Sequence, residues 1–510
     1  MEVAGTSLAI VATIDLCLNR YGPQVVALCR TYRDADVQFA ERVLQVRSTW
    51  KKTSLQLVFV RNIAQELDPD LREIQEETLS ILVGRLRLAL TRLEGLKVAE
   101  NGGTRRKLKF AVGKSGLDNI IQDLSDWQAR FDPSWLLLLR LGTPIIDDEL
   151  RKNDLGSEET SSLTLFRKLA ANKPMEGNDR PHVSLPPSGL TGVRMQKIAH
   201  STTRFFQQPE TGKWLIADNV PCYSKQHQQL VRKNIRTLAQ KLSCGDPDRS
   251  GLLRCRGFTP SSEQILAGLS SFEMLFYAPQ YSIMPPKSLR TSLQAPSRHN
   301  LTQRIALARQ LARAVSYVHA LGFVHKNVRP ETIVGFSQPD GTARRFFLVG
   351  FEQPRLADGQ TMIRGDNEWH RNLYRHPSRQ GLRPEETFVM QHDMYSLGVC
   401  LLEIGLWQSL VVYDEYDETA RPSLSLGVSS SEPDKHQPLA VKARLVQLVE
   451  EKLPGLVGEV YSDVVLNCLT CLDEDNVDFG DEVEFVDEDG VLVGVRYIEK
   501  VLMKLDEIVV

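Results

Sequence analysis

Residues 324–334 read Val324-His325-Lys326-Asn327-Val328-Arg329-Pro330-Glu331-Thr332-Ile333-Val334. An amphipathic helix is predicted before this stretch, over residues 301–319, because apolar side chains recur there at steps of three and four. A hairpin is predicted after it, with strands at 333–336 and 345–349 and a turn at 339–341. The polar stretch therefore connects a helix to a hairpin, and the hairpin leads into Leu348-Val349-Gly350-Phe351-Glu352.

The stretch resembles the catalytic loop of protein kinases, H-R-D-L-x-x-x-N. His325 and Pro330-Glu331 match that pattern. Asn327 stands where a kinase has its catalytic Asp, and Thr332 stands where it has a magnesium-binding Asn. The resemblance implies a protein kinase domain that lacks the groups needed for phosphoryl transfer.

Two further motifs follow in the order that the resemblance implies. The hairpin places Gly350 and Phe351 at the first two positions of D-F-G, so the magnesium-binding Asp is replaced by a residue without a side chain, and Phe351 remains as a packing residue. Residues 392–398 resemble the start of the central helix of the large lobe, D-x-x-S-x-G. By this resemblance Asp393 is structural and accepts backbone N–H groups of the catalytic loop.

The small lobe is expected to begin near Val193 and to extend to about residue 285, and the whole resemblance covers roughly residues 193–508. No Gly-rich phosphate loop precedes its first predicted strand. The third strand, 214–220, carries Asp218 or Asn219 at the position of the phosphate-binding Lys, and the sequence leaves open which of the two. The helix predicted over 226–242 offers no Glu for the missing ion pair.

These substitutions remove the catalytic chemistry. Asn327 cannot accept a proton as a carboxylate does, and loss of a positioned general base costs about 10²–10⁴ in rate. Thr332 offers magnesium one neutral oxygen and Gly350 offers none. We therefore expect no catalytic residue, no metal site, no ATP or magnesium cofactor, and a core hydrogen-bonding role for His325. A divergent ATP-binding kinase is the alternative; it would need Glu352 for magnesium and Lys197 or Lys213 for phosphate.

Residues 1–142 are predicted to form an all-α bundle. Apolar residues recur at helical steps over 37–50 and over 117–131. A helix between them has a start signal at Asp68-Pro69 and an expected stop at Gly95. Such stripes are stable only when they pack together. Residues 143–192, rich in Pro and Gly, are expected to be a partly ordered linker.

A short basic cluster lies between the second and third of these predicted helices. It is expected in a loop, where it either is solvated or contacts anionic lipid, which would contribute about 1 kcal/mol per basic side chain. Its cationic residues are Arg105, Arg106, Lys107 and Lys109.

The N-terminal part is similar to the fungal HeLo and HeLo-like domains, through the pattern Ile-x-x-Leu-x-x-Trp-x-x-x-Phe-Asp at residues 121–132. The fold expected for the chain is thus multidomain, an all-α bundle followed by an α+β bilobal kinase-like domain. This layout resembles fungal cell-death and incompatibility proteins and the mixed-lineage-kinase-domain-like executioners of necroptosis. It implies a pseudokinase that binds protein partners and regulates a bundle that self-associates and acts on anionic membranes. A soluble pseudokinase scaffold without membrane action is the alternative.

Composition limits the partners, metal sites and cellular location that can be expected. A net charge of −2 exerts no overall attraction on nucleic acid, and none is expected as a partner. Eight Cys include one lone C-x-x-C, Cys468 and Cys471, which predicts reduced thiols rather than zinc. The apolar N-terminal run is interrupted by Asp15 and is too short to span a bilayer. We therefore expect a cytoplasmic protein that is recruited to a membrane on activation.

Overall fold

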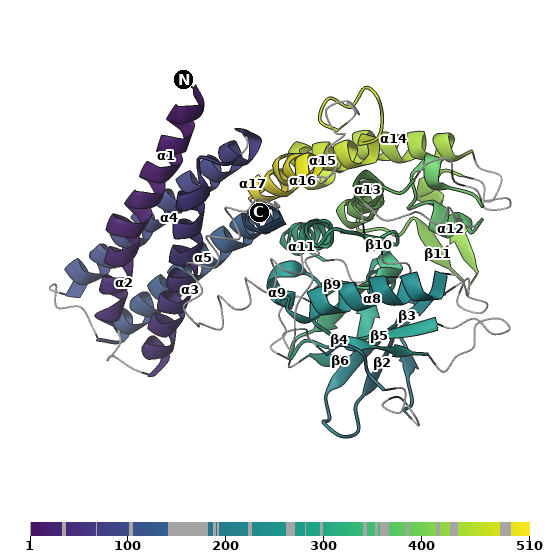
Figure 1. Ribbon diagram of the computed structural model, residues 1–510, viewed down its shortest axis with the longest axis horizontal. Coiled ribbons are helices and arrows are strands. Elements are labelled where there is room, and N and C mark those ends of the chain that lie inside the picture. The colour runs from purple at the N-terminus through teal and green to yellow at the C-terminus, as the bar shows by residue number, and fades with distance from the viewer. Residues whose placement is uncertain are drawn as a thin grey trace. The chain divides into compact units, whose positions relative to one another are not determined.

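The computed structural model divides the chain into two compact units, Met1–Arg167 and Lys168–Val510. The structure describes residues 2–32, 37–67, 69–100, 106–140, 182–186, 190, 193–222, 227–261, 271–280, 282–295, 299–339, 344–351, 355–356, 367–382, 384, 387–414, 419–428, 437–479 and 491–509. The first unit is helical and the second contains both sheets and helices, as Figure 1 shows. The expected order, an all-α part followed by an α+β part, is confirmed at this level.

The first unit is built from long helices. They are α1 (Glu2–Leu16), the π-helix η1 (Cys17–Tyr21), α2 (Gly22–Arg30), α3 (Val37–Ile63), α4 (Pro69–Glu100) and α5 (Arg106–Arg140). Trp127 of α5 is fully buried, and its indole N–H donates to the Thr78 carbonyl oxygen of α4 at 2.8 Å. The helices α2 and α3 pack so closely that a Cβ added to Gly22 would lie 1.8 Å from the Trp50 ring. None of the helices in the described ranges is long and apolar enough to cross a lipid bilayer.

Two local expectations for this unit are wrong. Helix α4 does not stop at Gly95 but continues to Glu100, because a single exposed Gly costs a helix only about 1 kcal/mol. The basic cluster is not all in a loop, because Arg106, Lys107 and Lys109 belong to the first turn of α5. Arg105 and most of the expected linker lie outside the described residues.

The second unit begins with a region that we call the sheet region, residues 182–277. In its described part the strands β1 (Gln196–Lys197), β2 (Arg204–Gln207), β3 (Trp214–Pro221), β4 (Cys255–Pro260) and β5 (Ser271–Tyr277) form one antiparallel sheet in the order β1-β2-β3-β5-β4. The helices α8 (Gln228–Ser243) and α9 (Pro247–Ser250) connect β3 to β4. Ser184, inside the expected linker, pairs with Phe258 of β4, so this part of the linker is ordered against the sheet.

The remainder, which we call the helical region, is organised around α11 (Leu301–Ala320) and α13 (Met390–Leu406). Between these two helices the chain forms β7 (Phe323–Val324), the 3₁₀ helix η5 (Pro330–Thr332), and the hairpin of β8 (Ile333–Ser337) and β9 (Arg345–Leu348). The expected helix and hairpin are therefore present. The other elements are β6 (Ile283–Ser288), α10 (Leu289–Gln294), β10 (Arg355–Leu356), α12 (Trp369–Asn372), η6 (Pro377–Arg379), β11 (Val411–Tyr413), β12 (Ala420–Pro422), η7 (Leu424–Leu426), α14 (Pro438–Val457), α15 (Glu459–Thr470), α16 (Val491–Tyr497), the π-helix η9 (Ile498–Met503) and α17 (Lys504–Glu507).

Candidate functional site

One buried carboxylate holds the backbone of residues 325–332, which we call the 325–332 loop. Asp393 of α13 accepts the N–H groups of His325 at 2.7 Å and Lys326 at 2.8 Å, and the Nε2–H of His319 at 3.1 Å. Burial alone would raise the pKa of Asp393, but the hydrogen bond from His319 and the other N–H donors hold it below its usual value. Lys326 has a φ of 67°, an uncommon conformation for a residue other than Gly. Asp393 therefore fixes the start of the loop.

Asn327 uses its side-chain amide to connect the loop to Gly350. Its Nδ2 donates to the Gly350 carbonyl oxygen at 3.0 Å, and its Oδ1 accepts from Arg329 Nε at 2.8 Å. An amide donates through nitrogen and accepts through oxygen, so one side chain makes both bonds. A carboxylate at this position could not donate to Gly350. Asn327 is thus suited to a structural bond and not to accepting a proton.

Thr332 and Gly350 are packed so closely that each restricts the other. The Thr332 hydroxyl lies 2.7 Å from the Asn327 carbonyl oxygen and 2.9 Å from that of Arg329, and it is fully buried. Gly350 has a φ of +83°, and a Cβ added to it would lie 2.4 Å from Thr332 Cγ2. With Thr332 in this place, no larger side chain fits at residue 350 without movement.

The two candidates on β3 contact different parts of the protein. Asp218 is buried, and its Oδ2 accepts the backbone N–H of Phe351 at 2.8 Å. Asn219 faces the other side of the sheet, where its Nδ2 donates to Glu273 Oε1 at 2.8 Å. Because successive residues of a strand point to opposite faces, only Asp218 reaches the segment after Gly350. Of the two candidates, Asp218 is therefore the one that contacts the segment after Gly350.

The His325 ring is buried in contact with this group. Its Nδ1 accepts the Asn327 N–H at 3.3 Å, and its ring centre lies 4.5 Å from that of Phe351. Burial lowers the pKa of His325 to about 4, against the opposing effect of Asp393. The imidazole is therefore neutral at pH 7. The Phe351 ring also stacks on Phe276 of β5, at 6.3 Å between ring centres.

Asp218, Asn327, Thr332, Gly350 and Phe351 thus form one group, which we call the Asn327 cluster. Side chains from β3 and from the 325–332 loop bond to the backbone of residues 350–351, so two segments far apart in the sequence are fastened to a third. The polar atoms at these positions bond to the protein itself. The Asn327 cluster is therefore a structural hydrogen-bond network.

A second buried network was not anticipated from the sequence. Arg290 of α10 is completely buried; its Nε donates to Glu331 Oε1 at 3.1 Å and its Nη1 to Glu403 Oε1 at 2.7 Å. Arg290 also donates to Tyr374, whose hydroxyl donates to Glu403 Oε2 at 2.8 Å. Burial would raise the pKa of Glu331, but Arg290 and Arg329 lower it to about 2. No motif marks Arg290 in the sequence, since its partners come from distant segments.

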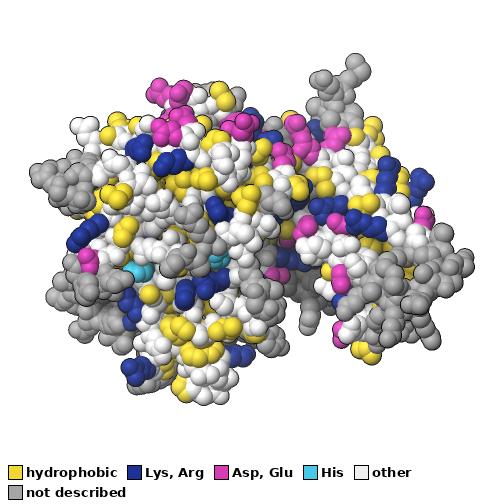
Figure 2. All heavy atoms as spheres, turned by 180° about the vertical axis from the view of Figure 1, so that it is seen from behind, with side chains coloured by type: hydrophobic (Ala, Val, Ile, Leu, Met, Phe, Trp, Pro, Cys, Tyr) yellow, Lys and Arg dark blue, Asp and Glu magenta, His cyan; other side chains and the backbone are white. Residues whose placement is uncertain are grey.

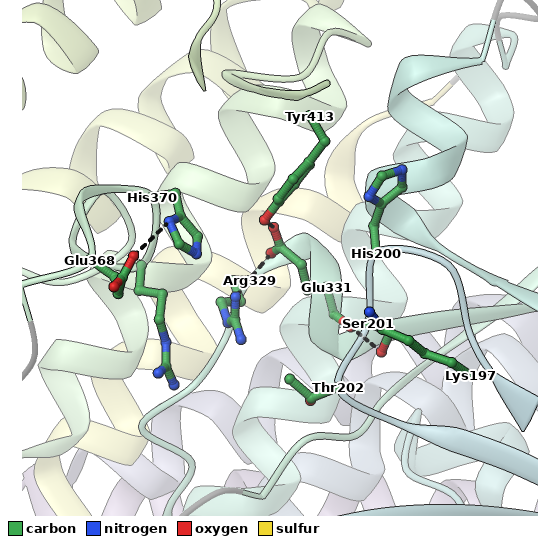
Figure 3. A pocket seen from close by; sticks show the side chains of 10 residues that line it. Lys197, His200, Ser201, Thr202, Arg329, Glu331, Glu368, His370 and Tyr413 are labelled. Atoms are coloured by element: carbon green, nitrogen blue, oxygen red, sulfur yellow. Dashed lines mark hydrogen bonds and ion pairs between the residues drawn. The ribbon is translucent and has the colours of Figure 1, made fainter. Parts of the chain in front are cut away.

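An open pocket of about 360 Å³ lies beside these networks. One wall is the turn between β1 and β2, which contributes His200, Ser201 and Thr202, and Figure 3 shows this wall opposite Glu368 and His370. The remaining lining residues are Lys197, Arg329, Glu331, Arg371 and Tyr413.

The other candidates from the sequence are placed as follows. Lys213 lies over the Tyr277 ring at 5.7 Å from its centre, and Lys197 lines the pocket. The side chains of Arg105, Arg106, Lys107 and Lys109, and residue Glu352, lie outside the described part. Cys468 and Cys471 are buried and unbridged. Among the described residues, no group of three or more His, Cys, Asp or Glu side chains is placed to hold a metal ion.

Comparisons with known proteins add no relative to this description. No protein-family model matches the chain, and no curated protein matches its sequence.

Proposed function

We propose that residues 193–510 form a protein-kinase-like domain that does not transfer phosphate and that regulates the N-terminal helices. The observation that carries this proposal is the Asn327 cluster. At the positions of the catalytic Asp and the magnesium ligands, Asn327, Thr332 and Gly350 bond to one another. At the position of the phosphate-binding Lys, Asp218 accepts the Phe351 N–H.

The order of elements supports the kinase-like part of the proposal. The resemblance requires a third strand, a helix and two further strands before the catalytic loop, and β3, α8, β4 and β5 follow in this order. It also requires a carboxylate on the central helix that accepts the loop's N–H groups, and Asp393 has these bonds. Both features support the kinase-like part of the proposal.

The chemistry of the cluster supports loss of catalysis. Phosphoryl transfer depends on positioning and on neutralisation of the phosphate charge by metal ions and a Lys. Asp218 brings an acidic group where a cation is needed, and Gly350 brings no ligand.

The test is thermal unfolding of the full chain with ATP, with and without magnesium. A ligand present at 100 times its dissociation constant stabilises a protein by about 2.7 kcal/mol, which raises Tm measurably. We expect no shift at millimolar ATP. A magnesium-dependent shift that the Asn327→Ala variant abolishes would contradict the proposal and favour the divergent kinase.

For the N-terminal helices we propose self-association and action on anionic membranes, as the HeLo resemblance implies. The supporting observation is α1, which is mostly apolar and exposes 68% of Leu8. An exposed apolar side chain on such a helix is available to a lipid surface or to a second copy.

Dye leakage from phosphatidylserine-containing vesicles tests this second part. The protein is used as the full chain and as residues 1–167, after circular dichroism has shown that the fragment is helical. We expect leakage from the fragment, reduced by Leu8→Asn but not by Leu44→Asn, a residue of α3 that is exposed to 63%. If neither form binds or permeabilises the vesicles, the soluble scaffold is the better description.

A further inference from the structure

The outward face of α8 is basic. The helix contains Lys and Arg but neither Asp nor Glu, and its apolar side, which includes Leu238, is buried where the helix packs against β4. The exposed cations are Arg232, Lys233 and Arg236. Side chains four residues apart in a helix lie on the same face, with about 5–6 Å between their Cβ atoms. Arg232 and Arg236 therefore form a closely spaced pair of like charges.

These three cations have no acidic partner in the part of the chain that the structure describes. The nearest acidic residues in the sequence are already paired with other cations. Asp246 Oδ2 lies 3.4 Å from Arg249 Nε, and Asp248 forms an ion pair with Arg345. Like charges four residues apart on a helix are destabilising. An acidic partner would remove this cost.

Helix α15 carries the opposite charge at the same spacing. It contains Asp and Glu but neither Lys nor Arg. Glu459 and Asp463 are four residues apart and exposed, and neither forms an ion pair with another described residue. The neighbouring α14 adds exposed Glu450 and Glu451, beside the exposed cation Lys452. Figure 2 shows Asp and Glu gathered along the upper edge of the second unit, where Figure 1 places α14 and α15.

The two charged faces belong to different parts of the second unit. Helix α8 packs against the sheet, whereas α15 packs against α13 and α14, and Figure 1 shows the two helices well apart. One molecule therefore does not pair its own α8 with its own α15. Each face also has a partly exposed apolar side chain three residues before a charged one, with Leu230 exposed to 41% and Val460 to 40%.

We propose that a second copy of this chain is the partner, and that α8 of one molecule binds α15 of the next. Arg232 and Arg236 then lie opposite Glu459 and Asp463, and the equal spacing on the two helices lets both ion pairs form together. Because the two surfaces differ, the contact is heterologous and adds molecules head to tail.

This contact is separate from the self-association proposed for the N-terminal helices, and it uses only residues of the second unit. Its consequence does rest on the proposed function. A head-to-tail assembly collects several N-terminal units in one particle, which raises their local concentration and favours their joint action on a membrane.

Sedimentation velocity of the full chain, without lipid and over a series of protein concentrations, tests the contact. The Debye length falls from about 30 Å at 0.01 M salt to about 3 Å at 1 M, so the attraction between exposed charges is screened at the higher salt. We expect oligomers whose mass rises with protein concentration at the lower salt, and monomers at the higher salt.

Charge reversal identifies the two surfaces. The variants Arg232→Glu/Arg236→Glu and Glu459→Arg/Asp463→Arg should each weaken association about tenfold or more, because each replaces two attractions by two repulsions. A mixture of the two variants should recover association, because the reversed α8 of one variant is complementary to the reversed α15 of the other. The chain that carries all four substitutions should recover it as well.

The matched control is Arg47→Glu/Lys51→Glu, which makes the same charge change at the same spacing on α3 of the first unit. It should leave association unchanged, and an unchanged Tm shows that each variant is folded. The proposal is overturned if the wild type stays monomeric at the lower salt, if the control loses as much association as the α8 variant, or if neither the mixture nor the fourfold variant recovers it. Oligomers that persist equally in every variant would also refute the roles of α8 and α15. Vesicle leakage does not enter this measurement, so such a failure is distinct from a failure of the function proposed for the N-terminal helices.

Discussion

Replacing Gly350 by Ala tests the packing of the Asn327 cluster directly. The backbone at Gly350 has a φ of +83°, where a residue with a Cβ costs about 1–2 kcal/mol more than Gly. The new Cβ would also lie 2.4 Å from Thr332 Cγ2, and overpacking a core of this kind costs about 1–3 kcal/mol. We therefore expect Gly350→Ala to lower the free energy of unfolding by about 2–5 kcal/mol.

The control separates the two costs. Gly322 has a similar φ of +75°, but an added Cβ meets nothing within 4 Å. Gly322→Ala should therefore cost only the backbone part, about 1–2 kcal/mol. The difference between the two variants measures the contact with Thr332.

The assay is urea denaturation of the full chain, with hydrogen exchange of peptides from α11 and α13 as the readout for the second unit. Thr332→Ser removes Cγ2 but keeps the hydroxyl. The double variant Gly350→Ala/Thr332→Ser should therefore lose less free energy of unfolding than the sum of the losses of the two single variants. If Gly350→Ala costs no more than Gly322→Ala, or if Thr332→Ser shows no coupling to it, the steric argument is refuted.

Three other predictions concern the buried polar groups, all measured by the same unfolding assay. Arg290→Met leaves Glu331 and Glu403 buried without their cation and should cost about 3–5 kcal/mol, whereas a cost below about 1 kcal/mol would show that the network is dispensable. Asp218→Ala leaves the Phe351 N–H without its acceptor and should cost about 1–3 kcal/mol; an unchanged midpoint would contradict this role. His325 has a pKa of about 4 in the folded protein and of about 6.5 in the unfolded chain. Its contribution to the free energy of unfolding is therefore fully present above pH 6.5 and is lost as the pH falls toward 4. Between pH 7 and pH 5 the loss is about 2 kcal/mol for this side chain, and His325→Gln should flatten the profile by that amount.

The local elements could be predicted from the sequence to a large extent. The helices around residues 37–50, 117–131 and 301–319 and the hairpin after the 325–332 loop follow from periodicity and turn residues, which act over a few positions. The boundary at Gly95 was wrong because a helix end depends on the balance of the whole helix and not on one residue. Asn327, Thr332 and Gly350 could also be singled out from the sequence, since each occupies one position in the motif that resembles a kinase loop.

What only the tertiary structure decided is how these residues meet. The choice between Asp218 and Asn219 depends on the register of β3 against β5, because a shift of one residue exchanges the two faces of a strand. The Arg290 network joins side chains up to 113 positions apart, and the pocket joins a turn in the sheet region to a loop and a helix in the helical region. Contacts over such distances leave no periodic pattern in the sequence, because they arise only when the packed elements bring separate segments together.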